Sequence, residues 1–149
     1  MEAVIFVGIQ GVGKSTFFKD RFFDSHIRIN LDMLRTRNRE RILFEACLEA
    51  KQKFVFDNTN LTREEREKYI VKAKSYGFKI IGYYFQTNLE RAIEQNNRRF
   101  GKAKIPEKGL LSAFKRLKIP IFAEGYDELY YVWINDGNQF VVEKWKDEI

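Results

Sequence analysis

A glycine-rich segment near the amino terminus combines residue types that bind phosphate. Residues 8 to 15 read Gly-Ile-Gln-Gly-Val-Gly-Lys-Ser, which matches the P-loop pattern. Glycine adopts positive φ and lets the backbone approach a phosphate without a Cβ clash. The amides of residues 11 to 16 should therefore point at a β-phosphate. The residues expected to bind the nucleotide are Gly8, Gln10, Gly11, Val12, Gly13, Lys14, Ser15 and Thr16.

The polar side chains at the end of this segment have separate expected tasks. Lys14 supplies a positive charge to the β- and γ-phosphates. The Ser15 hydroxyl can bind Mg²⁺, because this hard cation prefers oxygen ligands. Thr16 is placed to contact the α-phosphate. ATP and Mg²⁺ are therefore the expected cofactors.

A second candidate segment, Asn30-Leu31-Asp32-Met33-Leu34-Arg35, follows the next short apolar run. Ligands collect beyond the carboxyl ends of strands in open α/β sheets. Asp32 can accept the proton of an acceptor hydroxyl, and Arg35, on the same side of a helical turn, can hold phosphate oxygens. The alternative is that Asp32 caps a helix beginning near Met33. The two roles are compatible.

A third candidate segment ends another apolar strand with Asp57-Asn58-Thr59-Asn60. An aspartate at this position can hold the Mg²⁺ shell from beside the P-loop. Asn58 or Asn60 can orient water or an acceptor. The alternative is a turn that uses Asn and Asp for its own hydrogen bonds and needs no ligand. We favour a metal-site role for Asp57.

A basic segment around residues 95–106 has the composition of a lid. Arg98 and Arg99 end a predicted helix, and Gly101 follows in a loop that can act as a hinge. An arginine that closes over the site neutralises charge on the transferring phosphoryl group. The alternative is a solvated basic face, which we prefer for Lys102 and Lys104.

The elements that position these segments alternate short apolar runs with longer helical stretches, a pattern typical of α/β folds. Ala3–Val7 is unbroken and apolar, as expected for a strand buried on both faces. Thr62 with Glu65, and Thr87 with Glu90, form capping boxes that open helices. The prediction is a single three-layer α/β domain over residues 1–149, with about five mainly parallel strands and helices on both faces. Strands are expected over 3–7, 27–30, 53–57, 78–85 and 129–134, an antiparallel edge strand over 139–145, and helices over 14–24, 34–51, 63–76, 88–99 and 106–118.

Composition restricts the classes of protein to consider. A chain of 149 residues predicts one hydrophobic core. Cys47 is the only cysteine of the sequence, so neither an internal disulfide nor a clustered-cysteine metal site is expected. No apolar run reaches the roughly 20 residues that span a bilayer, and the first residues lack a secretory pattern. We expect no membrane partner and a cytoplasmic location.

Charge is distributed unevenly along the chain. The formal net charge is +6, yet the window from Arg91 to Lys118 carries +7 and the segment from Glu124 to Ile149 carries −5. A basic patch beside an acidic tail suits a partner rich in phosphate. The alternative is a solvated basic helix.

Taken together, the segments resemble a P-loop kinase of the 5′-polynucleotide kinase group. The resemblance rests on the P-loop, on Asn30-Leu31-Asp32-Met33-Leu34-Arg35, on Asp57-Asn58-Thr59-Asn60-Leu61-Thr62, and on Asn96-Asn97-Arg98-Arg99 followed by Pro106. It implies a P-loop kinase fold with a helical basic lid over about 95–106. It also implies ATP-dependent transfer of the γ-phosphate to the 5′-hydroxyl of DNA or RNA.

The resemblance also implies roles for individual residues. Asp32 matches the general base and Arg35 the arginine that supports the phosphates. Arg99 matches the phosphate-binding arginine of the lid. Either Asp57 or Asn58 matches the acidic residue after the third strand.

One departure from the family pattern leaves the acceptor open. Between Arg35 and Asp57 lie 21 residues, where phage-type polynucleotide kinases have considerably more. In the phage-type kinases this longer segment helps to build the channel that binds the acceptor. The alternatives are therefore a kinase for a small metabolite, nucleoside or nucleotide sugar, similar to zeta-toxin-like enzymes, and a nucleotide-binding switch without phosphotransfer.

Overall fold

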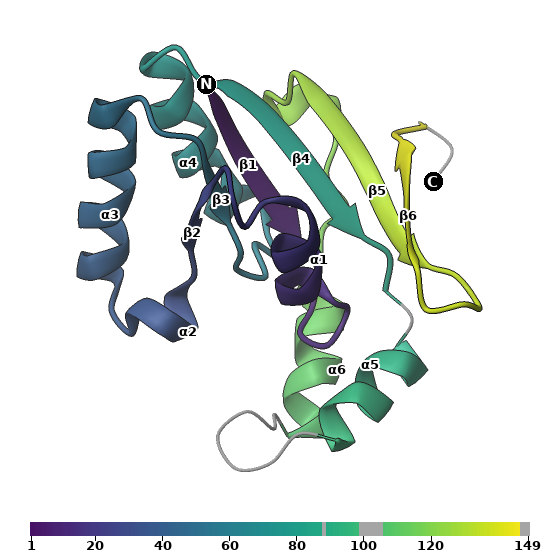
Figure 1. The fold of residues 1–149 in the computed structure, drawn as a ribbon. Helices are drawn as coiled ribbons and strands as arrows, with labels where there is room; N and C mark the ends of the chain where they lie inside the picture. The colour runs from purple at the N-terminus through teal and green to yellow at the C-terminus, as the bar shows by residue number, and fades with distance from the viewer. Residues whose placement is uncertain (88, 99–105, 147–149) are drawn as a thin grey trace.

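A mainly parallel sheet forms the centre of the computed structural model, which describes residues 1–87, 89–98 and 106–146. Within these residues the sheet has six strands in the order β2-β3-β1-β4-β5-β6 (Figure 1). Neighbours from β2 to β5 pair in parallel, and β6 pairs antiparallel with β5. The predicted fold class and edge strand are confirmed. The strands are β1 (Glu2–Val7), β2 (Ile27–Ile29), β3 (Phe54–Phe56), β4 (Lys79–Phe85), β5 (Glu128–Ile134) and β6 (Phe140–Lys144).

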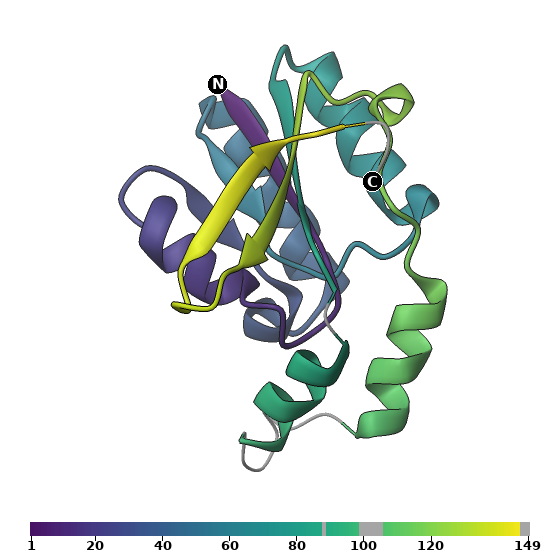
Figure 2. The same ribbon diagram turned by 90° about the vertical axis from the view of Figure 1, so that its right-hand side faces the viewer.

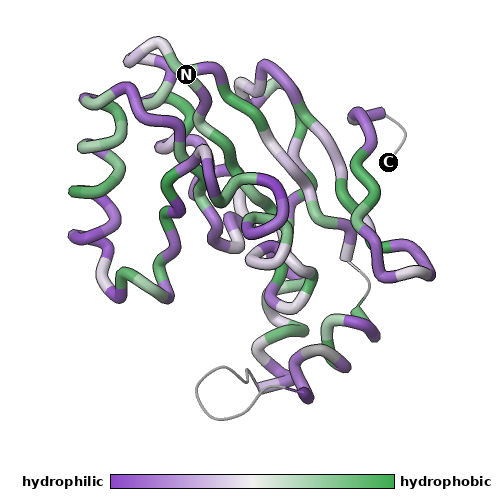
Figure 3. Tube along the Cα trace, viewed as in Figure 1, coloured by the Kyte–Doolittle hydropathy of each residue, from purple (hydrophilic) through white to green (hydrophobic). Residues whose placement is uncertain are grey.

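Strand β1 lies between β3 and β4 and is apolar on both faces, as predicted. Ala3 and Ile5 belong to one hydrophobic cluster, and Val4 and Phe6 belong to the other. Side chains alternate across a strand, so one unbroken apolar run supplies both clusters. Figure 3 shows the hydrophobic residues concentrated along these central strands.

Helices cover both faces of the sheet, which gives three layers (Figures 1 and 2). Phe17 and Phe18 of α1 (Lys14–Arg21) pack with Phe6 and the other residues of its cluster. Phe44 of α3 (Arg37–Ala50) and Tyr69 of α4 (Arg63–Ser75) pack against the opposite face. The ring centroids of Phe6 and Phe17 lie 5.8 Å apart, close enough for an edge contact that stabilises this layer.

The segment after β2 differs from the prediction. Instead of one helix over 34–51, a single turn, α2 (Leu31–Leu34), precedes α3. Arg35 ends α2 with a left-handed φ of 77°. The Thr36 hydroxyl accepts a hydrogen bond from the Arg39 amide at 3.1 Å and so begins α3. The two helices therefore run in different directions (Figure 1).

Helix α4 begins at the predicted capping box. The Thr62 hydroxyl accepts from the Glu65 amide at 3.2 Å, and the Glu65 carboxylate accepts from the Leu61 amide at 3.1 Å. The box therefore satisfies two amides as expected, although the second one belongs to Leu61 rather than Thr62. Gly77, with a φ of 83°, follows the helix in the conformation that favours glycine.

Two helices extend beyond the carboxyl end of the sheet. They are α5 (Leu89–Asn97) and α6 (Glu107–Arg116), and they contact each other. A short 3₁₀ turn (Phe122–Glu124) then leads into β5. Residues 99–105 of the predicted lid, which include Arg99, Lys102 and Lys104, lie outside the described residues. No helix in the described part of the chain is long and apolar enough to cross a membrane.

Candidate active site

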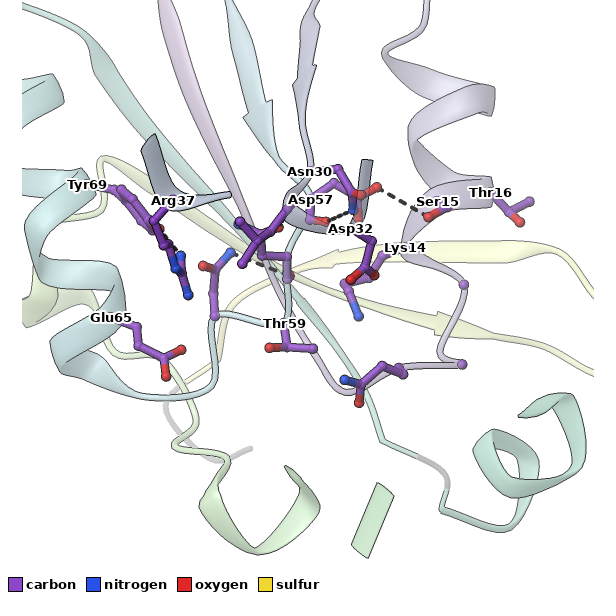
Figure 4. A pocket seen from close by; sticks show the side chains of 16 residues that line it. Lys14, Ser15, Thr16, Asn30, Asp32, Arg37, Asp57, Thr59, Glu65 and Tyr69 are labelled. Carbon is purple, nitrogen blue, oxygen red and sulfur yellow. Dashed lines mark hydrogen bonds between the residues drawn. The ribbon is translucent and has the colours of Figure 1, made fainter. Parts of the chain in front are cut away.

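A cavity of about 340 Å³ opens at the carboxyl ends of β1, β2 and β3 (Figure 4). Parallel strands bring the segments that follow them to one edge of the sheet, so the three polar segments found in the sequence meet here. Helices α3 and α4 close the end opposite the P-loop. The lining residues are Gln10, Gly11, Gly13, Lys14, Ser15, Thr16, Asn30, Leu31, Asp32, Arg37, Asp57, Asn58, Thr59, Asn60, Glu65 and Tyr69.

The P-loop adopts the conformation that its glycines were predicted to allow. Gly11 and Gly13 have φ values of 84° and 98°, in the left-handed region that L side chains rarely adopt. A Cβ at Gly11 would also lie 3.0 Å from the Ala92 carbonyl oxygen. Gly13 is the N-cap of α1, so the positive end of that helix faces the cavity.

Lys14 is buried and folds across its own loop. Its ammonium donates hydrogen bonds to the carbonyls of Gly8 at 2.8 Å and Ile9 at 2.7 Å. These bonds compensate the buried charge and hold it at the cavity wall. The position suits a lysine that donates to the loop carbonyls in the absence of nucleotide and to phosphate oxygens when a nucleotide binds.

Ser15, Asp57 and Arg28 form a hydrogen-bonded triangle beside the P-loop. The Ser15 hydroxyl donates to Asp57 Oδ2 at 3.3 Å. Arg28 Nε donates to the same carboxylate oxygen at 2.7 Å, and Arg28 Nη2 donates to Ser15 Oγ at 2.9 Å. Burial raises the pKa of Asp57, while Arg28, Lys14 and the Ser15 hydroxyl oppose the shift.

The Ser15–Asp57 pair fits a divalent cation. Both side chains present oxygen atoms to the cavity, and the two oxygens are within hydrogen-bond distance of each other. Mg²⁺ is bound in nucleotide sites by one or two protein oxygens together with phosphates and water. Ser15 and Asp57 would hold the ion there.

Asp32 lies on α2 and also lines the cavity. Asn30, rather than Asp32, caps this helix, because its Oδ1 accepts from the Met33 amide at 2.9 Å. The structure therefore assigns the capping role to a neighbouring residue. The Asp32 carboxylate is exposed and points into the same cavity as Lys14 (Figure 4).

Two asparagines fasten the segment after β2 to the segment after β3. Asn30 Nδ2 donates to the Asp57 carbonyl at 2.6 Å, and Asn58 Oδ1 accepts from the Leu31 amide at 2.8 Å. Asn58 Nδ2 then donates to the buried Glu40 carboxylate at 3.0 Å. Asp57 thus contacts Ser15, whereas Asn58 holds the backbone beside Asp32.

Arg37 and Tyr69 lie at the end of the cavity away from the P-loop (Figure 4). Tyr69 donates to Glu40 at 2.7 Å, and Arg37 Nη1 contacts Glu40 at 3.1 Å and the Tyr69 hydroxyl at 3.0 Å. Burial, with the nearby Glu40 carboxylate, raises the pKa of Tyr69. Arg35 is exposed and is not among the lining residues, whereas Arg37 lines the cavity.

A second cavity of about 480 Å³ lies on the other side of the P-loop. Thr16, Gly11 and Gly13 line both cavities. The remaining lining comes from Val12 of the P-loop, from the end of β4 and the residues after it, from α5 and from the β5–β6 hairpin, and it combines polar side chains with aromatic ones. These further residues are Val12, Phe85, Gln86, Thr87, Arg91, Ala92, Val132, Trp133, Ile134, Asn138 and Phe140.

Some of the expected site residues meet in the structure and others do not. Six of the expected P-loop residues line the first cavity together with Asp32 and Asp57; the six are Gln10, Gly11, Gly13, Lys14, Ser15 and Thr16. Val12 lines the second cavity, Gly8 lines neither, and Arg99 lies outside the described residues. Sequence reasoning missed Arg28 and Arg37. A charged residue inside the apolar β2 run was the one available signal for Arg28, and nothing local distinguished Arg37 from its neighbouring arginines.

Comparison with protein families gives a match over residues 4–119 to the family described as AAA domain. The chain belongs to this family. The bifunctional polynucleotide phosphatase/kinase of Schizosaccharomyces pombe is 30% identical over 132 residues, or 84% of this chain. The chain spans 32% of that relative's length.

Solved structures with the same fold include a gluconokinase and a protein in complex with ADP-AlF3. A gluconokinase from Sinorhizobium meliloti 1021 superposes with a TM-score of 0.62 at 17% identity, over 88% of this chain and 81% of that one. Chaetomium thermophilum Kti12 in complex with ADP-AlF3 gives 0.68 at 15% identity, over 90% of each chain. The PezAT toxin-antitoxin system of Streptococcus pneumoniae gives 0.62 at 12% identity, over 94% of this chain and 70% of that one. The AAA domain described here therefore has a P-loop kinase fold, and this family binds nucleotides.

Proposed function

We propose that this protein is an ATP-dependent kinase that phosphorylates the 5′-hydroxyl of a polynucleotide. The observation that carries the proposal is that Lys14 and Asp32 line the same cavity. The exposed Asp32 carboxylate thus lies across this cavity from the P-loop. The relative in Schizosaccharomyces pombe, named as a polynucleotide phosphatase/kinase, supports this choice of acceptor.

The donor nucleotide would occupy both cavities. The triphosphate lies along the P-loop amides, with Lys14 at the β- and γ-phosphates and Thr16 at the α-phosphate. The nucleoside extends into the second cavity, where Trp133 and Phe140 offer aromatic surface. Mg²⁺ held by Ser15 and Asp57 would neutralise charge on the bridging phosphate oxygens when bound.

The acceptor would approach from the opposite end of the first cavity. Its hydroxyl proton passes to the Asp32 carboxylate as the oxygen forms a bond to the γ-phosphorus. The bond from the γ-phosphorus to the β–γ bridging oxygen breaks, and ADP leaves with the electron pair. Arg37 provides a positive charge for an acceptor phosphate, and Arg99 would close over the transferring group.

A panel of acceptors tests the proposal. The protein is incubated with γ-labelled ATP and Mg²⁺, together with 5′-hydroxyl DNA, 5′-hydroxyl RNA or gluconate as a small hydroxyl compound. We expect label on an oligonucleotide and no label on the same oligonucleotide when its 5′ end is already phosphorylated. Label on gluconate alone would instead establish a small-molecule kinase, and nucleotide binding without transfer to any acceptor would establish a switch.

A further inference from the structure

Arg28 donates hydrogen bonds to both of the oxygens that fit a divalent cation. Its Nε donates to Asp57 Oδ2 at 2.7 Å and its Nη2 donates to Ser15 Oγ at 2.9 Å. The Ser15 hydroxyl itself donates a hydrogen bond to the same Asp57 oxygen. A cation that bound both oxygens would need the lone pairs to which Arg28 now donates.

Arg28 is also the movable member of this triangle. The Asp57 side chain is 1% exposed, whereas the Arg28 side chain is 29% exposed on β2, which is at one edge of the sheet. Ser15 is fixed in the first turn of α1. The guanidinium can therefore leave toward solvent, while the two oxygens keep their places.

The positive charge of Arg28 stabilises the folded protein by compensating the buried Asp57 carboxylate. Asp57 is buried, and a buried carboxylate without a positive partner strongly destabilises a fold. Lys14 also acts on Asp57 electrostatically, but it is engaged with the carbonyls of its own loop. Arg28 thus compensates the metal-binding carboxylate when no metal is bound.

We propose that Arg28 is a placeholder cation, which occupies the metal position in the metal-free protein and is displaced from Ser15 and Asp57 when a divalent cation binds. The inference deepens the proposed function and rests on it for the identity of the ion. It follows that the protein without nucleotide binds Mg²⁺ weakly. The ion then enters efficiently only together with the nucleotide phosphates, which supply the remaining ligands.

Titration with Mn²⁺, followed by electron paramagnetic resonance in the absence of nucleotide, tests the proposal directly. Arg28→Gln removes the competing charge, so we expect its Mn²⁺ affinity to rise by about tenfold or more over the unchanged protein. Lys53→Gln is the matched control, because Lys53 is exposed and precedes β3, at the opposite end of that strand from Asp57. We expect its affinity to change by less than about twofold. An Arg28→Gln protein that binds Mn²⁺ no more tightly than the unchanged protein overturns the proposal.

A second measurement uses the unchanged protein and does not depend on the folding of a variant. The Arg28 Nε–H resonance is followed by NMR while ADP is added first and Mg²⁺ second. We expect the resonance to keep its hydrogen-bonded position with ADP alone and to shift when Mg²⁺ is added. A resonance that stays in place while Mg²⁺ shifts the P-loop amides overturns the placeholder role. P-loop amides that do not respond to ADP would contradict the proposed kinase function, and the Mn²⁺ titration would still decide the role of Arg28.

Discussion

At the scale of single residues, the site contains groups that suit ligand binding but lower the free energy of unfolding. Asp57 is the clearest case, because it is 2% exposed and its pKa is raised by burial in spite of Arg28 and Lys14. A raised pKa means that the folded protein holds the Asp57 proton more tightly than the unfolded chain does. Ionised Asp57 therefore lowers the free energy of unfolding.

The replacement Asp57→Asn tests this conclusion. Between the ordinary pKa of an aspartate and the raised pKa of Asp57, the folded state binds more protons than the unfolded state, so stability falls as the pH rises through that interval. The Asp57→Asn variant has no carboxyl group at this position, so its stability does not fall for this reason. Urea unfolding of both proteins from about pH 4 to about pH 7 should show the variant gaining stability relative to the unchanged protein as the pH rises. A relative loss over the same interval would show that Arg28 outweighs burial.

The conformation of the P-loop was predictable from sequence because its determinants are local. Gly8 to Thr16 are expected to bind phosphate through consecutive amides and through the start of the helix that follows, so their spacing alone predicts this role. Arg28 and Arg37 act through contacts with residues 29 and 32 positions away along the chain. Only the strand order and the start of α3 bring these pairs together.

At the scale of elements, the site depends on how α2 is held. The helix has four residues and cannot be stable by itself. Asn30 caps it and also contacts the Asp57 carbonyl, while Asn58 holds the Leu31 amide. These bonds fix the backbone that carries Asp32, and the buried Glu40 in turn holds Asn58.

The variant Asn58→Ala should loosen α2 without touching the P-loop. It leaves the Leu31 amide and Glu40 each short of one partner, which we expect to lower the free energy of unfolding by about 1–3 kcal/mol. Turnover should fall more than nucleotide affinity, since Asp32 moves and Lys14 does not. Calorimetric titration with ADP and steady-state kinetics separate the two effects.

The control for this experiment is Asn38→Ala on the exposed face of α3. Asn38 accepts one hydrogen bond from Arg41 and lies outside the cavity. Equal losses of turnover in the two variants would contradict the positioning role of Asn58.

The boundaries of these elements show what sequence patterns can resolve. The Thr62 capping box predicted the start of α4 correctly, because both of its bonds involve neighbouring residues. The break between α2 and α3 was not predicted. Arg35 has a left-handed φ that arginine does not favour, so its residue type gives no sign of the break. Thr36, a good N-cap, was the available signal.

At the scale of the whole molecule, the fold brings three strand ends and two helices around one cavity. The buried Arg66 joins these parts, since it donates to the carbonyls of Asn60 and Leu61 and to the Glu124 carboxylate. The segment that leads into β5 is thereby fixed to the loop that follows β3. Helices α5 and α6 extend beyond the same edge (Figure 2) and carry part of the basic window seen in the sequence.

The charge of the molecule makes a prediction about its acceptor. Binding of an oligonucleotide should weaken steeply with salt, because basic residues that contact phosphates release counterions. About three phosphate contacts predict a roughly 20-fold loss of affinity for single-stranded DNA between about 50 and about 200 mM salt. Fluorescence anisotropy with a labelled 5′-hydroxyl oligonucleotide measures this slope. A slope near zero would favour a small acceptor without phosphates.

The role of Asp32 as general base is tested by comparing the unchanged protein with Asp32→Asn in phosphate transfer to a 5′-hydroxyl oligonucleotide. Asn is similar in size to Asp but cannot accept the proton, so we expect turnover to fall by at least about 100-fold. ADP affinity should remain within about twofold, because Asp32 lies on α2 and not on the P-loop. A variant that turns over within a few-fold of the unchanged protein would show that Asp32 is not the general base.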